Sequence, residues 1–207
     1  MLSAGVGRNV SDWSGSGKAA VRVIAGTLKG RQLQSPRGLQ VRPTSGRLRE
    51  TLFNILGHRV ESAEVLDACA GSGALGLEAL SRGALRVVFV DRDRRACELV
   101  TANVARCGVE DRSRVILGSL PAAMAAPDVP DLFDLILLDP PYDDPQIGAI
   151  LSALGGALRS GGTLVVERSK RTAAQQAAGL DLVRTVKAGD SALDFYQQIG
   201  ESPSATT

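Results

Sequence analysis

Short apolar runs alternate with segments of helical periodicity along most of this chain. The apolar runs predict strands at residues 64–67, 86–90, 113–117, 133–138 and 163–167. The segments between them predict helices at residues 73–82, 93–107 and 147–159. Strands that alternate with helices form a parallel sheet with helices on both faces. We therefore predict an α/β fold with a doubly wound, Rossmann-like sheet.

The last part of the chain breaks this alternation. Two apolar segments, residues 182–187 and 192–199, are separated only by the short segment 188–191. A tight loop can join antiparallel strands, whereas parallel strands need a long crossover. The sequence therefore predicts a mostly parallel sheet of seven strands with an antiparallel last strand.

A small appendage is expected before the sheet. Residues 21–33 read as a short β-hairpin with a glycine-containing turn. Thr44 or Ser45 can cap a helix that runs to Leu56 and ends at Gly57. The apolar stripe of this helix should dock on the main domain and leave its arginines free to point elsewhere.

Basic residues are concentrated in this N-terminal part. Residues 1–50 hold nine basic and two acidic residues, whereas the remainder holds 15 basic and 20 acidic residues. Such an imbalance favours an anionic partner such as nucleic acid, although a solvated basic surface would have the same composition. The candidate RNA contacts are Arg22, Lys29, Arg31, Arg42, Arg47 and Arg49.

Several classes of protein are excluded or disfavoured. No apolar run approaches the roughly 20 residues that span a bilayer, and residues 1–18 lack the apolar core of a signal peptide. The three cysteines have no metal-like spacing, and His58 is the only histidine, so we expect no metal site. A cytoplasmic, monomeric protein is expected.

A glycine-rich turn follows the first predicted strand. The segment Gly71-Ser72-Gly73-Ala74-Leu75-Gly76 fits the pattern G-x-G-x-x-G of nucleotide-binding loops, which is a weak signal alone. Asp67 precedes it at the strand end, where a carboxylate would repel a pyrophosphate but suits a cationic ligand such as S-adenosylmethionine. The alternative is a purely structural role, in which Asp67 only caps the turn. The cofactor-binding candidates in this turn are Asp67, Ala70, Gly71, Ser72 and Gly73.

Other candidates for the same ligand follow the next two strands. Asp91 ends the second strand, where doubly wound folds place a carboxylate that accepts from ribose hydroxyls. Arg92 could lay its aliphatic stem beside an adenine, while Asp93 is expected to cap the next helix. Ser119 and Leu120 follow the third strand and are further cofactor-binding candidates, and Ser119 could bond the adenine amine.

The segment Asp139-Pro140-Pro141-Tyr142 closes the fourth apolar run. Two prolines donate no backbone hydrogen bond and rigidify the turn, so they present carbonyl oxygens at a fixed geometry. A carboxylate, a carbonyl and an aromatic face together suit a planar group that carries an amine, such as a nucleobase. These four residues are the predicted catalytic residues, and a sharp turn with an exposed tyrosine is the alternative.

Two blocks of the sequence are informative together, namely Arg42-Pro43-Thr44 with residues 47–54, and Leu66-Asp67 with residues 70–82. They resemble the RsmD family, bacterial 16S ribosomal RNA guanine-N2 methyltransferases. The resemblance covers residues 21–199 and implies S-adenosylmethionine as donor, a guanine in 16S rRNA or the 30S subunit as acceptor, and RNA contact by the appendage. Residues 1–20 are rich in Gly and Ser without periodicity, so the expected organisation begins with a disordered extension at 1–20. An RNA-contacting hairpin and helix at 21–58, a class I methyltransferase domain at 59–200 and a disordered tail at 201–207 follow. Two features depart from the family pattern, namely the 1–20 extension and Ser119.

Three other functions remain open at this point. DNA adenine-N6 methyltransferases share the glycine turn and the Asp-Pro-Pro-Tyr segment, but the chain lacks a sizeable target-recognition domain. A nicotinamide-dependent oxidoreductase would bind a dinucleotide instead of S-adenosylmethionine. A non-catalytic RNA-binding module would leave residues 139–142 without a purpose.

Overall fold

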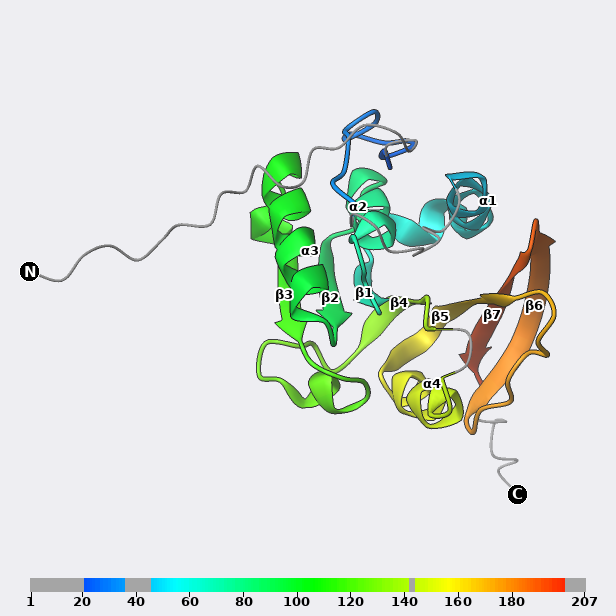
Figure 1. Cartoon of the computed structure of the whole chain (residues 1–207). Coiled ribbons are helices and arrows are strands. Elements are labelled where there is room, and N and C mark those ends of the chain that lie inside the picture. The colour runs from blue at the N-terminus through cyan, green and yellow to red at the C-terminus, as the bar shows by residue number, and fades with distance from the viewer. Residues whose placement is uncertain (1–20, 36–45, 142–143, 200–207) are drawn as a thin grey trace, which may run out of the picture.

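The computed structural model describes residues 21–35, 46–141 and 144–199, and its centre is one seven-stranded sheet (Figure 1). The strand order is β3-β2-β1-β4-β5-β7-β6. The strands are β1 (Glu64–Ala68), β2 (Arg86–Asp91), β3 (Ser113–Leu117), β4 (Phe133–Leu138), β5 (Leu158–Ser169), β6 (Leu180–Ala188) and β7 (Ser191–Gln198). The α-helices are α1 (Gly46–Leu56), α2 (Ala74–Ser81), α3 (Arg94–Cys107) and α4 (Ile147–Gly156), and the 3-10 helices are η2 (Gly57–Val60), η3 (Glu110–Arg112) and η4 (Ala122–Ala125).

The predicted doubly wound topology is confirmed. Strands β1 to β5 pair in parallel, and β7 inserts antiparallel between β5 and β6. Apolar side chains of the sheet point alternately into two clusters, as the two-residue period of a strand requires. One cluster packs against α1, α2 and α3, and the other packs against α4 and η4.

One predicted boundary is wrong. The helix expected at 147–159 ends at Gly156, and β5 begins at Leu158 instead of residue 163. Leu158 pairs with Phe133, and a register shift then brings Thr163 opposite Leu135. Helical periodicity in residues 157–159 is therefore overridden by pairing with a strand that is distant in the sequence.

Helix α2 is buried on all sides, which is unusual for a helix that lies on a sheet. Its inner face packs on the sheet and its outer face is covered by residues 21–35, which are drawn in blue above α2 (Figure 1). The covering segment is a tight antiparallel loop held by the bridge between Arg22 and Gln32, so the expected hairpin is present only as a single bridge.

The two polar side chains of α2 anchor this loop. Glu78 accepts hydrogen bonds from the backbone N–H groups of Ile24 (2.7 Å) and Ala25 (3.0 Å). Ser81 Oγ accepts from the N–H of Leu28 (2.9 Å) and donates to the carbonyl of Ala25. The polar side chains of a buried helix thus provide hydrogen-bond partners for the backbone groups of a loop that has little regular structure of its own.

The predicted helix α1 is confirmed to Leu56, with Gly57 at a positive φ of 53°. The proposed caps, Thr44 and Ser45, lie outside the described residues. No helix in the described ranges is long and apolar enough to cross a membrane. Within the same ranges no group of His, Cys, Asp and Glu residues could hold a metal ion, and the three cysteines are free thiols.

Candidate donor and acceptor site

The sheet order brings the predicted site residues together. Strand β1 lies between β2 and β4, so Asp67, Asp91 and Asp139 come from three adjacent strands at their carboxyl ends. The N–H of Asp139 donates to the carbonyl of Ala68 (3.4 Å), which fixes the end of β4 beside β1. Open parallel sheets bind ligands at this edge.

The glycine-rich turn adopts left-handed backbone conformations that explain its composition. Gly71 and Gly73 have φ values of 56° and 75°, and Cys69 is held at 65° although it carries a side chain. A Cβ atom on Gly71 would meet nothing within 4 Å, so the turn faces open space at this point. Gly76 serves another purpose, because its Cβ would lie 2.3 Å from Phe89 Cε1. The third glycine therefore allows α2 to pack closely on the sheet.

The remaining residues of the turn contribute backbone contacts. The N–H of Ala70 donates to the carbonyl of Val90 (3.0 Å), and the N–H of Gly73 donates to the carbonyl of Ala70 (2.7 Å). The carbonyl of Ser72 accepts from Asn103 Nδ2 (2.9 Å). These bonds fix the turn between β1, β2 and α3.

Asp91 fixes the glycine-rich turn as well as ending β2. Its Oδ2 accepts from the N–H of Gly71 (2.9 Å), and its Oδ1 accepts from the N–H of Asp93 (2.9 Å). The side chain is half-buried, and each carboxylate oxygen keeps acceptor capacity beyond these two bonds. Asp93 accepts from the N–H of Arg95 (2.8 Å) at the start of α3, which confirms it as the predicted cap.

Asp67 is 1% exposed, and its Oδ2 accepts from the N–H of Gly76 (2.8 Å). The contact that the structure gives it is therefore with α2, and its contact with a donor stays a prediction. Burial, and then the nearby charges of Asp139 and Asp91, raise the pKa of Asp67 to about 8 despite the hydrogen bond from Gly76. Below this pKa Asp67 is protonated, so the negative charge that would attract a cationic ligand at this edge comes from Asp91 and Asp139.

We expect the pH dependence of stability to report this carboxylate. Because its pKa is higher in the folded than in the unfolded protein, the stabilisation is complete below the unfolded value and is lost as the pH rises to about 8. Asp67→Asn keeps an acceptor for Gly76 but cannot ionise. The melting temperature of the ligand-free variant should decline less between pH 5 and pH 8, and parallel declines for the two proteins would contradict this assignment.

The other predicted donor contacts lie at the same edge. The N–H of Gly118 donates to the carbonyl of Asp91 (2.9 Å), which brings Ser119 and Leu120 beside the end of β2. Ser119 is exposed, and its carbonyl accepts from the N–H of Ala123 (2.9 Å). Leu120 is half-buried against the α4-side cluster, and Arg92 is exposed. No contact of these three side chains assigns a role to them.

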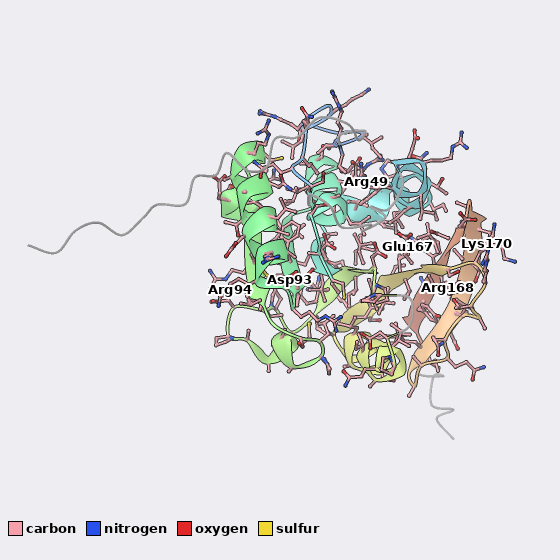
Figure 2. All side chains as sticks on the ribbon, in the orientation of Figure 1. Arg49, Asp93, Arg94, Glu167, Arg168 and Lys170 are labelled. Carbon is pink, nitrogen blue, oxygen red and sulfur yellow. The ribbon has the colours of Figure 1, made fainter. Side chains whose placement is uncertain are left out.

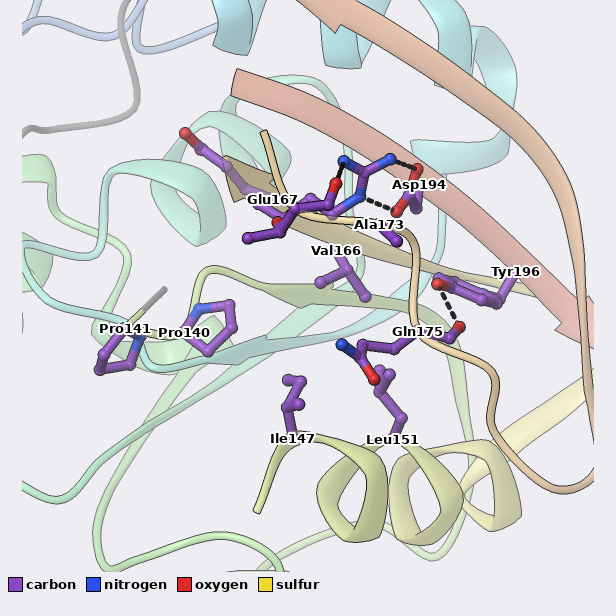
Figure 3. A pocket seen from close by; sticks show the side chains of 12 residues that line it. Pro140, Pro141, Ile147, Leu151, Val166, Glu167, Ala173, Gln175, Asp194 and Tyr196 are labelled. Carbon is purple, nitrogen blue, oxygen red and sulfur yellow. Dashed lines mark hydrogen bonds and ion pairs between the residues drawn. The ribbon is translucent and has the colours of Figure 1, made fainter. Parts of the chain in front are cut away.

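Asp139 is half-buried, Pro140 is buried and Pro141 is exposed, while Tyr142 lies outside the described residues. Both prolines line a pocket on the α4 face of the sheet (Figure 3). Residues from α4, β5, β7 and the segment after β5 complete it. The pocket is lined by Pro140, Pro141, Ile147, Leu151, Val166, Glu167, Arg168, Thr172, Ala173, Gln175, Asp194 and Tyr196.

The candidate RNA contacts divide into three groups. Arg22, Lys29, Arg31 and Arg47 are exposed, and Arg42 lies outside the described residues. The prediction for Arg49 is wrong, because this side chain is 3% exposed and turned from α1 toward α2 (Figure 2). Its Nη2 donates to the carbonyl of Arg22 (2.5 Å), and its Nε lies 3.7 Å from Glu78 Oε2.

Two polar residues carry roles that the sequence pattern did not predict. Glu78 holds residues 24 and 25, and Asn103 is fully buried between the appendage and the glycine-rich turn. Asn103 Oδ1 accepts from the N–H of Gln34 (2.8 Å), while Nδ2 donates to the carbonyls of Gln34 (3.0 Å) and Ser72 (2.9 Å). A polar residue on the apolar side of a predicted helix is the only signal that could have identified either one.

Comparisons with known proteins agree with the fold that carries this site. A family profile described as conserved hypothetical protein 95 matches residues 21–197. YlbH of Bacillus subtilis, named as a candidate rRNA methyltransferase, is 36% identical over 170 residues, which are 81% of this chain and 92% of YlbH. Ribosomal RNA small subunit methyltransferase D of Escherichia coli K12 is 38% identical over 127 residues, 61% of this chain and 63% of that protein. The solved structure of yhhF from Escherichia coli, described as a candidate methyltransferase, superposes with a TM-score of 0.76 at 33% identity and covers 87% of this chain and 98% of yhhF.

Proposed function

The chain belongs to the family described as conserved hypothetical protein 95, the RsmD family, and from this premise we propose that it methylates 16S ribosomal RNA of the small subunit. The proposed donor is S-adenosylmethionine, and the proposed acceptor is the exocyclic N2 of a guanine. The protein would act as a monomer in the bacterial cytoplasm. The DNA adenine alternative is not favoured, because the relatives carry the names of rRNA methyltransferases.

One observation carries this proposal. The glycine-rich turn and Asp91 stand at the ends of β1 and β2, and Asp139 with Pro140 stands at the end of β4, directly beside β1. A methyl donor bound at the ends of β1 and β2 would therefore lie next to an acceptor bound at the end of β4. Adjacent sites are what a direct transfer needs, because the reacting atoms must meet at about 3–3.5 Å.

The proposed mechanism assigns a positioning task to each residue. The exocyclic amine of guanine is a weak nucleophile because its lone pair is delocalised into the ring. Acceptors on its two N–H bonds favour a pyramidal nitrogen and aim the lone pair, and the Asp139 carboxylate and the Pro140 carbonyl are the proposed acceptors. Tyr142 would stack on the base, and Asp139 would take the proton that the nitrogen loses. When bound, S-adenosylmethionine supplies an electrophilic methyl group.

The experiment that tests the function is nucleoside mass spectrometry of 16S rRNA from cells with and without the gene, followed by restoration with the purified protein. N2-methylguanosine should be lost and then restored. A digest in which only the amount of N6-methyladenosine changes would instead assign adenine-N6 methylation to the enzyme. An unchanged digest would overturn the proposed function.

We expect Asp91→Ala to weaken S-adenosylmethionine binding by about 1–3 kcal/mol, because ribose hydroxyls and the N–H of Gly71 lose an acceptor. Isothermal calorimetry measures this loss. Asp111→Ala is the control, because Asp111 is an exposed carboxylate in η3. Binding of NAD by the unsubstituted protein, without binding of S-adenosylmethionine, would contradict the donor assignment.

We expect the exposed basic residues of the appendage to bind RNA phosphates. Replacing Lys29, Arg31 and Arg47 with alanine should weaken RNA affinity and lower the slope of log affinity against log salt by about one for each phosphate that is no longer neutralised. Calorimetric S-adenosylmethionine affinity should stay unchanged. Arg86→Ala, at the amino end of β2, is the control. A triple variant with unchanged affinity and salt slope but a much lower melting temperature would make these residues structural.

A further inference from the structure

The pocket beside Pro140 and Pro141 has apolar side chains on two opposite sides. Ile147 and Leu151 of α4 form one side, and Val166 of β5 lies opposite them (Figure 3). The rings of Pro140 and Pro141 border the pocket at the end that adjoins Asp139. A slot with apolar walls next to the proposed acceptor site suits a planar heterocycle.

Most polar groups of the pocket are already committed to the protein. Arg168 donates through Nε to Asp194 Oδ2 (2.5 Å) and through Nη2 to Asp194 Oδ1 (3.1 Å). Its Nη1 donates to the carbonyls of Ser169 (3.1 Å) and Thr172 (2.5 Å). Tyr196 Oη donates to the carbonyl of Gln175 (2.8 Å). These side chains therefore serve to hold the segment that follows β5.

Two of these bonds position Gln175. Arg168 holds the segment at Thr172, and Tyr196 holds it at the backbone of Gln175 itself. The amide of Gln175 points into the pocket, between Val166 and the side chains of Ile147 and Leu151 (Figure 3). Among the described residues no partner hydrogen-bonds to this amide. It combines one acceptor oxygen with a donor NH2 group.

We propose that Gln175 is a specificity-determining residue that reads the Watson–Crick edge of the acceptor guanine, an inference that rests on the proposed function. That edge carries the N2 amine, the N1–H donor and the O6 acceptor in sequence. With the amine on Asp139, the adjacent N1–H donates to Gln175 Oε1 and O6 accepts from Nε2. A primary amide matches this donor–acceptor pair.

The test is a cycle that pairs a protein variant with a substrate analogue. RNA that carries 2-aminopurine at the target keeps the amine at C2 but lacks both N1–H and O6. For the unsubstituted protein, this change should lower kcat/KM by on the order of 10-fold or more. For Gln175→Leu, methylation of guanine should fall, and the preference for guanine over 2-aminopurine should largely disappear. Equilibrium affinity for the two RNAs, measured without donor, should show the same loss of preference.

Gln176→Leu is the matched control, because Gln176 is the next residue and is exposed, as Gln175 is, but does not line the pocket. It should keep the guanine preference of the unsubstituted protein. A Gln175→Leu protein that also keeps this preference would overturn the inference and leave the proposed function intact. If the unsubstituted protein transfers no methyl group to guanine, this result would contradict the proposed function and the inference about Gln175 together.

Discussion

Asp139→Ala should lower the rate of methyl transfer by on the order of 100-fold or more while calorimetric affinity for S-adenosylmethionine stays nearly unchanged. The carboxylate is proposed to contact the acceptor amine, so its loss should affect the transfer step and leave donor binding intact. Single-turnover kinetics with saturating donor and RNA measure the transfer step directly. Tyr142→Ala should show the same separation, because its proposed contact is also with the base.

Asp131→Ala is the control for removal of a carboxylate, because Asp131 is exposed before β4, away from the carboxyl ends of the strands. Its rate should match that of the unsubstituted protein. Near-normal turnover by the Asp139 variant would rule out the proposed amine contact. A parallel loss of donor affinity would place Asp139 in the donor site instead.

Glu78→Ala should lower the free energy of unfolding by about 3–5 kcal/mol, because it leaves buried charges without their counter-ion. Glu78 is fully buried, and Arg82 Nε donates to its Oε1 (2.8 Å). Arg49, which is also buried, lies 3.7 Å away, and burial lowers the pKa of Arg49 while the charge of Glu78 opposes this shift. The variant would also leave the N–H groups of Ile24 and Ala25 without acceptors.

Urea denaturation measures this change, and Glu98→Ala on the exposed face of α3 is the control. Limited proteolysis should also cut residues 21–35 faster in the Glu78 variant, because Glu78 anchors that loop to α2. A loss below about 1 kcal/mol, the size typical of a surface pair, would show that apolar contacts alone hold the appendage.

Most of the fold was predictable because its signals are local. The apolar runs that form β1 to β4 are bounded by turns, and the period of each segment distinguishes strand from helix. The edge of the sheet that holds the site follows from topology, because parallel strands end on one side. The order of strands and turns in the sequence therefore places Asp91, Asp139 and the glycine-rich turn at one edge of the sheet, whereas the strand order that makes them neighbours comes from the structure.

Tertiary structure decided the role of individual polar residues. Arg47 and Arg49 are two positions apart on one helix, yet Arg47 is exposed and Arg49 is buried against Glu78. The charge of the two arginines predicts the same RNA-binding role for both. Charge alone does not indicate which side of the helix faces a carboxylate that is distant in the sequence. Gln175 and Gln176 pose the same problem, since only the anchoring by Tyr196 and Arg168 places the first of them at the pocket.

The sequence by itself therefore determined the alternation of strands and helices, the α/β class and the edge that carries the site, since these depend on local periodicity and strand direction. Only the tertiary structure decided that Glu78 and Asn103 join the appendage to the sheet domain and that β5 begins early beside Phe133. The bonds of Glu78 and Asn103 link residues 54 and 69 positions apart in the chain. Contacts over such separations produce no periodic pattern in the sequence, because each depends on how two independently formed elements pack together.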